Sequence, residues 1–410
     1  MVMNRYNLSD YASRKKIEYI FRKLPNFISN LLVEIINPIR KKIVINNIHP
    51  KWITLFVTNF CSARCEHCFY SKELNNKVEE LNLENLKKIF SSLKKPLNTL
   101  RITGGEPFLN KSLEDFIIFI DQNKISKKVS ITTHGMIPRL DERVKNMLNE
   151  LKYIHLHIGI SLDGLEETHD AFRKIKNGFN LATKHLFDFK NFLKHHNKFS
   201  FSTTTSLIRK ISIKKNEDDD SLELFELLKY LKSNIGVPSV GFDHVRTIKD
   251  DVFNVPDEIL SDFGLPPKKN ESVKIKHTRA DDVQLSVDEI ENVNNELNKS
   301  GFLGNDYLTM RRLEIEHEIL KTKKRIVDCL AGYIDCVIYP SLDVSVCEST
   351  KPFANLDSFN FDLLKLLNSD NAIERRKLTN KCSCTHPCHL SDSMAYDTKF
   401  LKEYFSSKRL

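Results

Sequence analysis

The chain has 410 residues, which is long enough for a large buried core and for more than one domain. Its 40% hydrophobic and 29% charged residues are typical of a globular protein, and no run of about 18 apolar residues predicts a membrane-spanning helix. The N-terminus lacks the pattern of a secretory signal. We therefore expect a cytoplasmic protein, in which clustered cysteines bind metal or perform chemistry more often than they form disulfides.

The formal net charge of +9 is concentrated near the N-terminus, because residues 1–48 contain nine Lys or Arg and three acidic residues. The segment FISNLLVEII and the following RKK predict a basic amphipathic helix. Its apolar face would contain Phe27, Ile28, Leu31, Leu32, Ile35 and Ile36. Such a helix either lies peripherally on a membrane or nucleic-acid surface, or packs on the body of the protein with a solvated basic rim. Of these two surfaces the membrane is the candidate contact, and no nucleic-acid partner is expected.

Six short apolar runs alternate with helical patterns in the first half of the chain. The runs cover residues 53–59, 99–104, 128–135, 153–164, 198–208 and 240–248. Repeated strand–helix units predict an α/β fold with a parallel sheet covered by helices, either open or curled into a full or partial barrel. In each of these arrangements ligands bind at the C-terminal ends of the strands.

The chain divides into four predicted parts. These are a basic amphipathic helical segment (1–48), a core barrel (49–250), a polar bridging region of helices and loops (251–325) and a cysteine-rich domain (326–410). The nine cysteines are an odd number, which fits disulfide pairing poorly, and they form two groups. Three lie in the barrel region, and six lie between residues 329 and 388.

The first group, Cys61, Cys65 and Cys68, follows the first predicted strand with the spacing C-x3-C-x2-C. Structural zinc normally takes four protein ligands, and His67 stands between two of the cysteines, where simultaneous ligation is awkward. Three thiolates instead suit a [4Fe–4S] cluster with one iron open to a substrate or cofactor. The spacing favours a cluster, and zinc is the alternative.

The second predicted strand runs directly into TGGEP, residues 103–107. Gly104 and Gly105 allow the backbone to approach a ligand closely and to adopt positive φ. Glu106 offers a carboxylate that can accept from an ammonium group beside the cluster. GGEP alone would be an ordinary turn, but its position after a strand and beyond the cysteine loop indicates a binding site.

Together, the cysteine spacing and GGEP resemble the radical S-adenosylmethionine (SAM) superfamily over roughly residues 50–250. The resemblance implies a partial (β/α)6 barrel and a radical SAM enzyme of oxidoreductase or maturase type. Cys61, Cys65 and Cys68 would hold the cluster, whose fourth iron position binds SAM. One-electron reduction, from a donor such as flavodoxin or ferredoxin, would cleave SAM to methionine and a 5′-deoxyadenosyl radical that abstracts hydrogen from the substrate.

The resemblance also implies a SAM pocket. Glu106 would accept from the SAM amino group, beside Gly104 and Gly105. Ser161 and Asp163, in ISLDG at the end of the fourth predicted strand, would contact the ribose and the carboxylate. Arg173 would pair with the SAM carboxylate, and its alternative is a surface salt bridge.

The second cysteine group resembles the SPASM and twitch domains, which carry auxiliary clusters in radical SAM enzymes. The resemblance implies one twitch-like auxiliary [4Fe–4S] cluster. Its ligands would be Cys329, Cys336, Cys347 and Cys388, with Cys384 as the alternative for the last place, and Cys382 has no clean counterpart. Two incompletely ligated clusters are a second interpretation, and a tetrahedral zinc site that uses His386 or His389 is a third.

Three positions depart from the family pattern. His134, in TTHG, stands where relatives usually have Asn, so that side-chain role is not carried over. His67 occupies a position that is often aromatic, where its ring could pack against adenine. Leu342 replaces the Gly that SPASM and twitch hairpins carry before a cysteine.

The substrate is not identified by the sequence, and a peptide, a lipid-linked molecule and a small molecule all remain open. Some 50 residues precede the barrel, which is too few for the leader-peptide-binding domain of many peptide-modifying relatives. The basic N-terminus favours a lipid-linked or membrane-surface substrate instead. The alternative function is a non-catalytic iron–sulfur or zinc scaffold for sensing or nucleic-acid binding, which would not need a SAM pocket.

Overall fold

The structure is a computed structural model that describes residues 21, 23–71, 73–75, 80–213, 222–245, 283–303, 306–379 and 385–406. The strands in this part of the chain form one sheet, in the order β6-β5-β4-β3-β2-β1-β7-β8-β9. Their bounds are β1 Trp52–Phe56, β2 Thr99–Thr103, β3 Lys128–Thr133, β4 His155–Ser161, β5 Phe199–Leu207, β6 Val240–His244, β7 Asp335–Ile338, β8 Asp343–Ser345 and β9 Ala354–Asn355.

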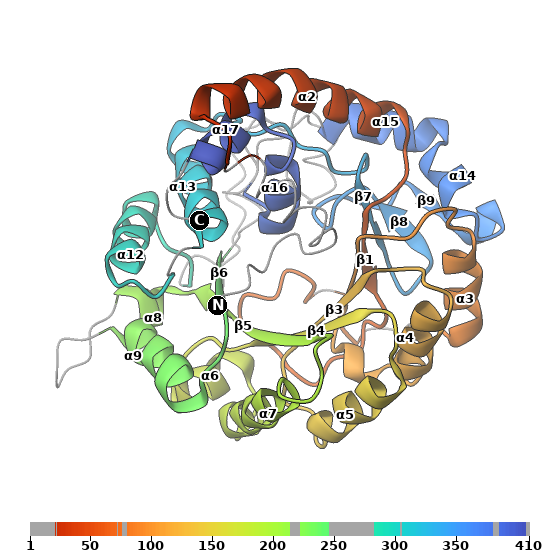
Figure 1. Cartoon of the computed structure of the whole chain (residues 1–410). Helices are drawn as coiled ribbons and strands as arrows, with labels where there is room; N and C mark the ends of the chain where they lie inside the picture. The colour runs from red at the N-terminus through yellow and green to blue at the C-terminus, as the bar shows by residue number, and fades with distance from the viewer. Residues whose placement is uncertain are drawn as a thin grey trace, which may run out of the picture.

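Helices surround this sheet (Figure 1). The α-helices are α2 Asn26–Asn46, α3 Leu83–Ser91, α4 Leu113–Gln122, α5 Leu140–Glu150, α6 Glu166–Arg173, α7 Gly178–Phe192, α8 Arg209–Ile213, α9 Glu223–Lys229, α12 Val287–Lys299, α13 Tyr307–Thr322, α14 Leu363–Leu367, α15 Asp370–Thr379, α16 Pro387–Met394 and α17 Thr398–Ser406. Two 3-10 turns, η2 Pro107–Leu109 and η4 Asp357–Phe359, and a π-helical turn, η3 Tyr230–Ile235, complete the described elements.

The six predicted strands all occur, and they pair in chain order as a parallel sheet. In β4 the apolar residues Leu156, Ile158 and Ile160 belong to the main core under the outer helices. Side chains alternate along a strand, so His157 and Ser161 lie on the inner face. The expected partial barrel is therefore confirmed, with an apolar outer face and a polar inner face.

The cysteine-rich region continues this sheet. β7 pairs in parallel with β1, with Ile53 opposite Cys336, and β8 and β9 extend the sheet in antiparallel order. The predicted domain boundary at residue 326 is thus not a boundary of the sheet. Leu342, in the turn between β7 and β8, has a φ of 69°, which is the left-handed backbone that glycine adopts without steric cost. This explains why a glycine is expected there.

Helix α16 lies inside the ring of outer helices (Figure 1). From α16, Asp392 Oδ1 accepts from Arg101 Nη2 of β2 at 2.8 Å, and His389 Nδ1 lies 2.6 Å from Asp335 Oδ2 of β7. All four side chains are on the polar inner face of the sheet or against it. The last part of the chain therefore packs within the partial barrel.

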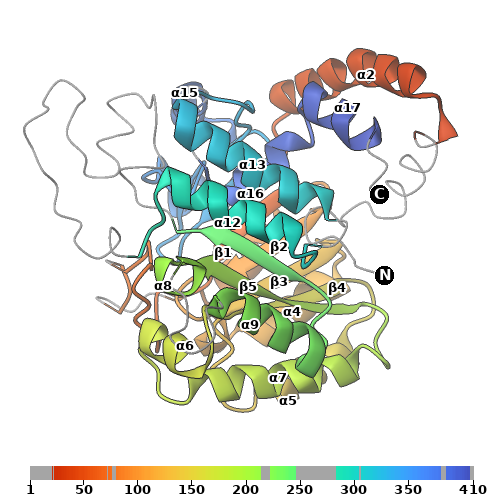
Figure 2. The ribbon, with the colours of Figure 1, turned by 90° about the vertical axis from the view of Figure 1, so that its left-hand side faces the viewer.

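The predicted bridging region is described from residue 283 onwards, apart from residues 304 and 305, and it contains α12 and α13. Ser286 and Glu289 form a capping box at the start of α12, which explains where this helix begins. Ile290, Val293 and Leu313 pack with α8, α9 and β6 in a second apolar cluster. This polar region thus contains two of the expected helices, and they close the side of the barrel near β6 (Figure 2).

The predicted N-terminal helix is α2, and it packs beside α17 (Figure 2). Its body-facing residues include Val33 and Asn37, and Asn37 Nδ2 donates to the Tyr396 carbonyl at 2.8 Å. Residues 1–20 lie outside the described part of the chain. Among the described helices, none has the length and apolarity needed to cross a membrane.

The loop after β2 lies directly against the loop after β1. The Gly105 N–H donates to the Thr58 carbonyl and the Glu106 N–H donates to the Phe60 carbonyl, both at 2.8 Å. A Cβ added at Gly104, whose φ is 135°, would lie 2.4 Å from the Thr58 oxygen, and one at Gly105 would lie 2.2 Å from the Phe60 oxygen. Both glycines are therefore required for the close approach of two backbone segments, where the sequence had suggested close approach to a ligand.

We expect Gly105→Ala to lower the free energy of unfolding by about 1–3 kcal/mol, because its methyl group overpacks the contact with the Phe60 carbonyl. Gly159→Ala is the matched control, since its Cβ would meet its nearest neighbours at 3.7 and 3.9 Å. Urea unfolding followed by circular dichroism measures both variants. Equal stability of the two variants would contradict the proposed backbone contact.

Candidate functional site

The three thiols of the first cysteine group lie in the loop at the C-terminal end of β1. The Cys61 N–H donates to Asn75 Oδ1 at 3.0 Å, and Asn75 Nδ2 donates back to the Cys61 carbonyl at 3.1 Å. On the other side, the Arg64 N–H donates to the Arg173 carbonyl at 3.1 Å. The loop is thus held both by its own return segment and by the C-terminal end of α6.

Burial makes these thiols weak acids. Loss of solvent raises the pKa of Cys61 to about 12 and that of Cys68 to about 11. Burial also raises the pKa of Cys65, although the nearby Arg173 guanidinium opposes the shift. Without a positive centre to bind, the thiols remain protonated at neutral pH.

The three thiols of this loop do not converge tightly on one point. The described residues contain groups of potential ligands whose donor atoms all lie within 4.8 Å of one another, but Cys61, Cys65 and Cys68 are not such a group. A single zinc ion needs its donors to converge in that way. An iron–sulfur cluster takes each thiolate on a different iron, so its thiolates are spaced more widely. The three thiols therefore lack the convergence that a single zinc ion requires.

Glu106 lies beside this loop, and its side chain is fully buried. Its Oε1 accepts from the Thr133 hydroxyl at 2.8 Å and from the Phe108 N–H at 3.1 Å, and its Oε2 accepts from the His134 N–H at 3.0 Å. Three donors, two of them from the end of β3, therefore fix the direction of the carboxylate. The sequence contained this signal, because TTHG ends the third predicted strand, but it assigned no role to Thr133.

His134 links β3 to the cysteine loop. Its Nδ1 accepts from the Met136 N–H at 2.9 Å, so in the neutral ring Nε2 carries the hydrogen. Nε2 lies 3.1 Å from the Ser62 hydroxyl and 3.3 Å from Glu106 Oε2. Burial lowers the pKa of His134, with Glu106 opposing this shift and Arg173 adding to it. A neutral imidazole therefore supplies a hydrogen-bond donor beside Glu106.

Asp163 and Arg173 form a buried ion pair between Asp163 Oδ2 and Arg173 Nη2. The Ser206 N–H donates to Asp163 Oδ1 at 2.8 Å. Burial alone would raise the pKa of Asp163, but the Arg173 charge outweighs it, and the pKa falls to about 2. Arg173 Nη1 also donates to Cys65 Sγ at 3.7 Å. Arg173 is thus an internal bridge to the cysteine loop, whereas the alternative expectation was a surface salt bridge.

The remaining predicted pocket residues surround this pair. Ser161 is half-buried at the end of β4, two residues before Asp163. His67 stacks on Phe172, with 4.9 Å between ring centroids, and its Nε2 lies 3.3 Å from the Ser206 hydroxyl. One face of the His67 ring is therefore covered by protein.

The C-terminal cysteines are dispersed over several surroundings. Cys336 packs in the main core with Val344, whereas the neighbouring Asp335 points to the inner face of β7 and contacts His389. Cys329 and Cys347 contribute to a separate small apolar cluster. The structure therefore does not bring Cys336 together with the other predicted cluster ligands.

Three C-terminal cysteines remain, and one of them lies in the described part of the chain. Cys388 lies in α16, where burial raises its pKa to about 11 and the nearby Arg101 opposes the shift. Cys384 and Cys382 lie outside the described residues. A different group of donors does converge, namely Cys347, His386 and His389, whose ligand atoms all lie within 4.8 Å of one another.

Comparison with curated proteins gives partial matches. The chain is 30% identical over 182 residues to a GTP 3′,8-cyclase of Helicobacter pylori, covering 43% of this chain and 52% of that protein. It is 27% identical over 191 residues to an Fe-coproporphyrin III synthase of Methanosarcina barkeri, covering 46% and 42%. The chain thus spans about half the length of the curated relatives it matches.

Comparison with solved structures gives a similar fold over most of the chain. The structure of hexahistidine-tagged anSMEcpe with bound AdoMet has a TM-score of 0.53 at 15% identity, covering 80% of each chain. The structure of Streptococcus suis SuiB bound to precursor peptide SuiA has a TM-score of 0.51 at 16% identity, covering 82% of this chain and 68% of SuiB.

Residues 55–229 match the model of the Radical SAM superfamily, and this segment contains the cysteine loop, Glu106 and the Asp163–Arg173 pair. The segment also contains the end of β1 and all of β2 to β5. The sequence match and the fold agree, and this part of the chain is similar to the radical SAM superfamily.

Proposed function

We propose that the protein is a radical SAM enzyme with its active site at the C-terminal ends of β1 to β5. One observation carries the proposal. Three thiols of one loop lie beside a fixed carboxylate, Glu106, and a buried ion pair, Asp163 with Arg173. Clusters of buried, interacting charged groups are frequent at functional sites, and these groups gather where parallel-sheet enzymes bind their ligands.

Cys61, Cys65 and Cys68 would hold the [4Fe–4S] cluster. Their high pKa values fit this role, because iron would bind the thiolates and displace their protons. The bound cluster would supply the electron for reductive cleavage of SAM. The external reductant is proposed to be a one-electron donor such as flavodoxin or ferredoxin.

Glu106 would accept from the SAM amino group. A carboxylate has about four acceptor positions, and three hydrogen bonds to Glu106 come from the Thr133 hydroxyl and the Phe108 and His134 backbone N–H groups. The remaining position, with His134 Nε2 at 3.3 Å beside it, would be open to the ammonium group. The fixed direction of the carboxylate means that little further ordering is needed when an ammonium group binds. Gly104 and Gly105 hold Glu106 close to the cysteine loop, as their backbone contacts require.

Arg173 would contribute to the binding of an anionic group of SAM. Its Nη2 is engaged by Asp163, but its buried Nε has no hydrogen-bond partner in the described part of the chain. A buried donor without a partner costs free energy, which an incoming carboxylate would recover. Ser161, next to this pair, would contact the ribose.

The substrate remains open among peptides, lipid-linked molecules and small molecules. The relatives carry names that refer to GTP and to Fe-coproporphyrin III, and SuiB was solved with a precursor peptide. The inner face of the sheet is polar in this chain, with His157 bonded to Ser200 and Ser202 between β4 and β5. A polar reacting group on the substrate would suit this surface.

The auxiliary [4Fe–4S] cluster stays a prediction. It is supported by the proximity of Cys329 and Cys347, and it needs further thiols from Cys384 or Cys388. The alternative of a non-catalytic scaffold is less well supported, since a scaffold would not need a fixed Glu106 or a buried Arg173 with an unsatisfied donor.

Cys65→Ala tests the proposal directly. The full chain is reconstituted anaerobically with iron and sulfide and incubated with SAM and dithionite, and 5′-deoxyadenosine is measured by chromatography. We expect the native protein to form 5′-deoxyadenosine and Cys65→Ala to fall to background, because two thiolates cannot hold the cluster.

Cys336→Ala is the matched control, because it makes the same substitution at a thiol that lies in the core of the sheet, away from the first cysteine group. It should keep the formation of 5′-deoxyadenosine. Native-like formation in Cys65→Ala, or none in the native protein, would refute the enzyme proposal.

A further inference from the structure

The residues Cys347, His386 and His389 form a compact set of donors that the radical SAM chemistry does not use. Each is buried, and their ligand atoms lie within 4.8 Å of one another. The two imidazole rings are 4.5 Å apart between centroids. A thiolate with two imidazoles is a borderline-soft donor set, which suits zinc.

Carboxylates orient both histidines. His386 Nε2 lies 3.0 Å from Glu348 Oε2, and His389 Nδ1 lies 2.6 Å from Asp335 Oδ2. Each carboxylate contacts one ring nitrogen, so the other nitrogen of each ring can serve as the metal ligand. Histidine ligands of metals almost always have such a carboxylate or carbonyl on the other ring nitrogen, because it fixes the tautomer and raises ligand basicity. The two carboxylates therefore stand where the outer partners of a metal site would lie.

We propose that Cys347, His386 and His389 bind a zinc ion, with the fourth tetrahedral position left to water or a further side chain. The ion would join the end of the β7–β8 hairpin to the start of α16. Because Asp392 on α16 pairs with Arg101 of β2, this ion would fix one wall of the barrel interior. The proposal competes with the auxiliary cluster for Cys347, and it is independent of the proposed activity at Cys61, Cys65 and Cys68.

Cobalt is the probe, because tetrahedral Co²⁺ bound to a thiolate gives a sulfur-to-metal charge-transfer band. The host is the full chain with Cys61→Ala, Cys65→Ala and Cys68→Ala, so that the first cysteine group cannot contribute. We expect one Co²⁺ per chain with a charge-transfer band, and displacement of the cobalt by one equivalent of Zn²⁺. Cys347→Ser in this host should abolish the band, and His389→Gln should weaken binding.

Asp335→Asn tests the orienting role, and we expect it to weaken Co²⁺ affinity by about 10- to 100-fold while the band persists. Two controls should leave the band and affinity unchanged. Cys336→Ala removes a thiol on the opposite face of β7. His185→Gln disrupts the other group of potential ligands, Asp141, His185 and Asp188.

Three outcomes would overturn the zinc proposal. One is the absence of Co²⁺ binding, and another is a charge-transfer band that survives Cys347→Ser. The third is anaerobic incorporation of about four irons per chain into the host, lost in Cys347→Ser, because this would assign Cys347 to an auxiliary cluster.

A second feature, the outward face of α2, carries a separate inference. The exposed residues follow a stripe at four-residue spacing, and their side chains are between 42% and 73% exposed. They are Phe27, Leu31, Ile35, Ile36, Ile39 and Ile43. A contiguous exposed apolar face of this kind marks an interaction site, whereas single exposed apolar residues do not.

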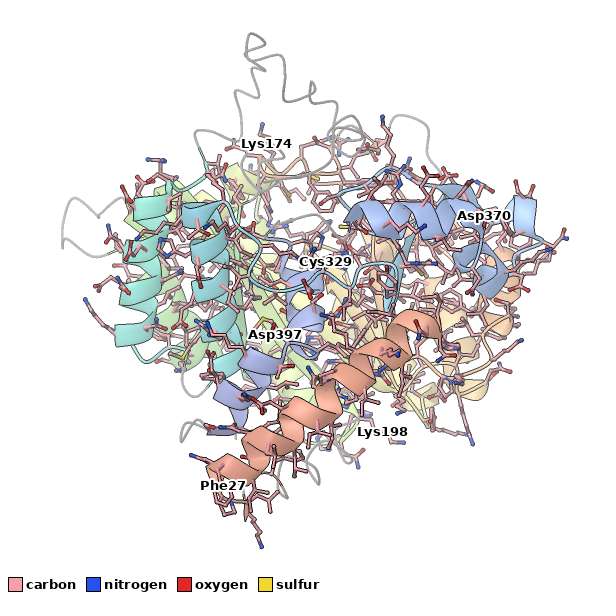
Figure 3. The ribbon with its side chains drawn as sticks, turned by 90° about the horizontal axis from the view of Figure 1, so that it is seen from above. Phe27, Lys174, Lys198, Cys329, Asp370 and Asp397 are labelled. Carbon is pink, nitrogen blue, oxygen red and sulfur yellow. The ribbon has the colours of Figure 1, made fainter. Side chains whose placement is uncertain are left out.

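The opposite face of α2 is occupied by the protein itself. Val33 and Asn37 are buried against the body, and Glu34 pairs with Lys402 of α17. Figure 3 shows α2 lying across the outside of the molecule, with Phe27 at its outer end. The helix is therefore docked by one face, and its apolar stripe is exposed among the residues that the structure describes.

We propose that this partner is the surface of an anionic lipid bilayer. Lys42 is exposed on α2, and the one acidic residue of α2, Glu34, is paired. The segment 1–48 contains nine Lys or Arg against three acids, which complements anionic headgroups. An amphipathic helix with apolar and basic residues lies in the plane of the interface.

Vesicle sedimentation of the full chain tests this proposal. Vesicles of phosphatidylcholine with and without phosphatidylglycerol are compared, and we expect preferential binding to the anionic vesicles. Ile35→Ser with Ile39→Ser should reduce binding by at least about tenfold, since two apolar side chains no longer enter the bilayer. Phe187→Ser with Leu193→Ser is the matched control, because these two apolar residues are exposed on α7 and at its C-terminal end, away from α2.

Absence of vesicle binding, or equal loss in the control pair, would overturn the lipid proposal. Light scattering provides a further check. A dimer that is abolished by Ile35→Ser with Ile39→Ser would also overturn it, because the stripe would then be covered by a second copy of the chain.

Discussion

The buried ion pair between Asp163 and Arg173 is the interaction on which the site depends. Asp163 follows β4, and Arg173 ends α6, so the pair fixes the position of this helix relative to the sheet. The Arg173 carbonyl then accepts from Arg64, and its guanidinium reaches Cys65. Breaking one partner of such a pair leaves an uncompensated buried charge. The geometry of the cysteine loop is therefore set by an electrostatic contact outside the loop.

A second constraint acts from the other side of the loop. The loop after β2 approaches the backbone of residues 58–60 so closely that Gly104 and Gly105 cannot carry a Cβ. This contact brings Glu106 to the thiols, while Thr133 and His134 of the next strand hold its carboxylate. Each neighbouring strand end thus contributes one element of the site. The parallel order of the sheet explains why residues far apart in sequence meet there.

The sequence predicted the strands well, because each apolar run has the length of a buried strand and is followed by a helical pattern. It also predicted the three thiols and Glu106, since both motifs directly follow strands. The pairing of β7 with β1 was not predictable, because parallel pairing between distant segments leaves no local signal. The role of Thr133 was missed for the same reason, as its partner Glu106 belongs to another loop.

The C-terminal cysteines show the limit of spacing as evidence. Their number and order resemble an auxiliary-cluster domain, but the strand period places Cys336 on the core side of β7. The converging donors are a thiol and two imidazoles, each imidazole oriented by a carboxylate. Which face of a strand a residue occupies is a property of the folded sheet, and motif spacing does not contain it.

The most direct test of the account concerns the fourth iron position of the proposed cluster. The full chain is reconstituted anaerobically and reduced, and electron–nuclear double resonance is recorded with SAM labelled with ¹⁵N in its amino group. The account predicts hyperfine coupling between the reduced cluster and the labelled nitrogen, because SAM would bind iron beside Glu106. A reduced cluster without coupling to the bound SAM would contradict it.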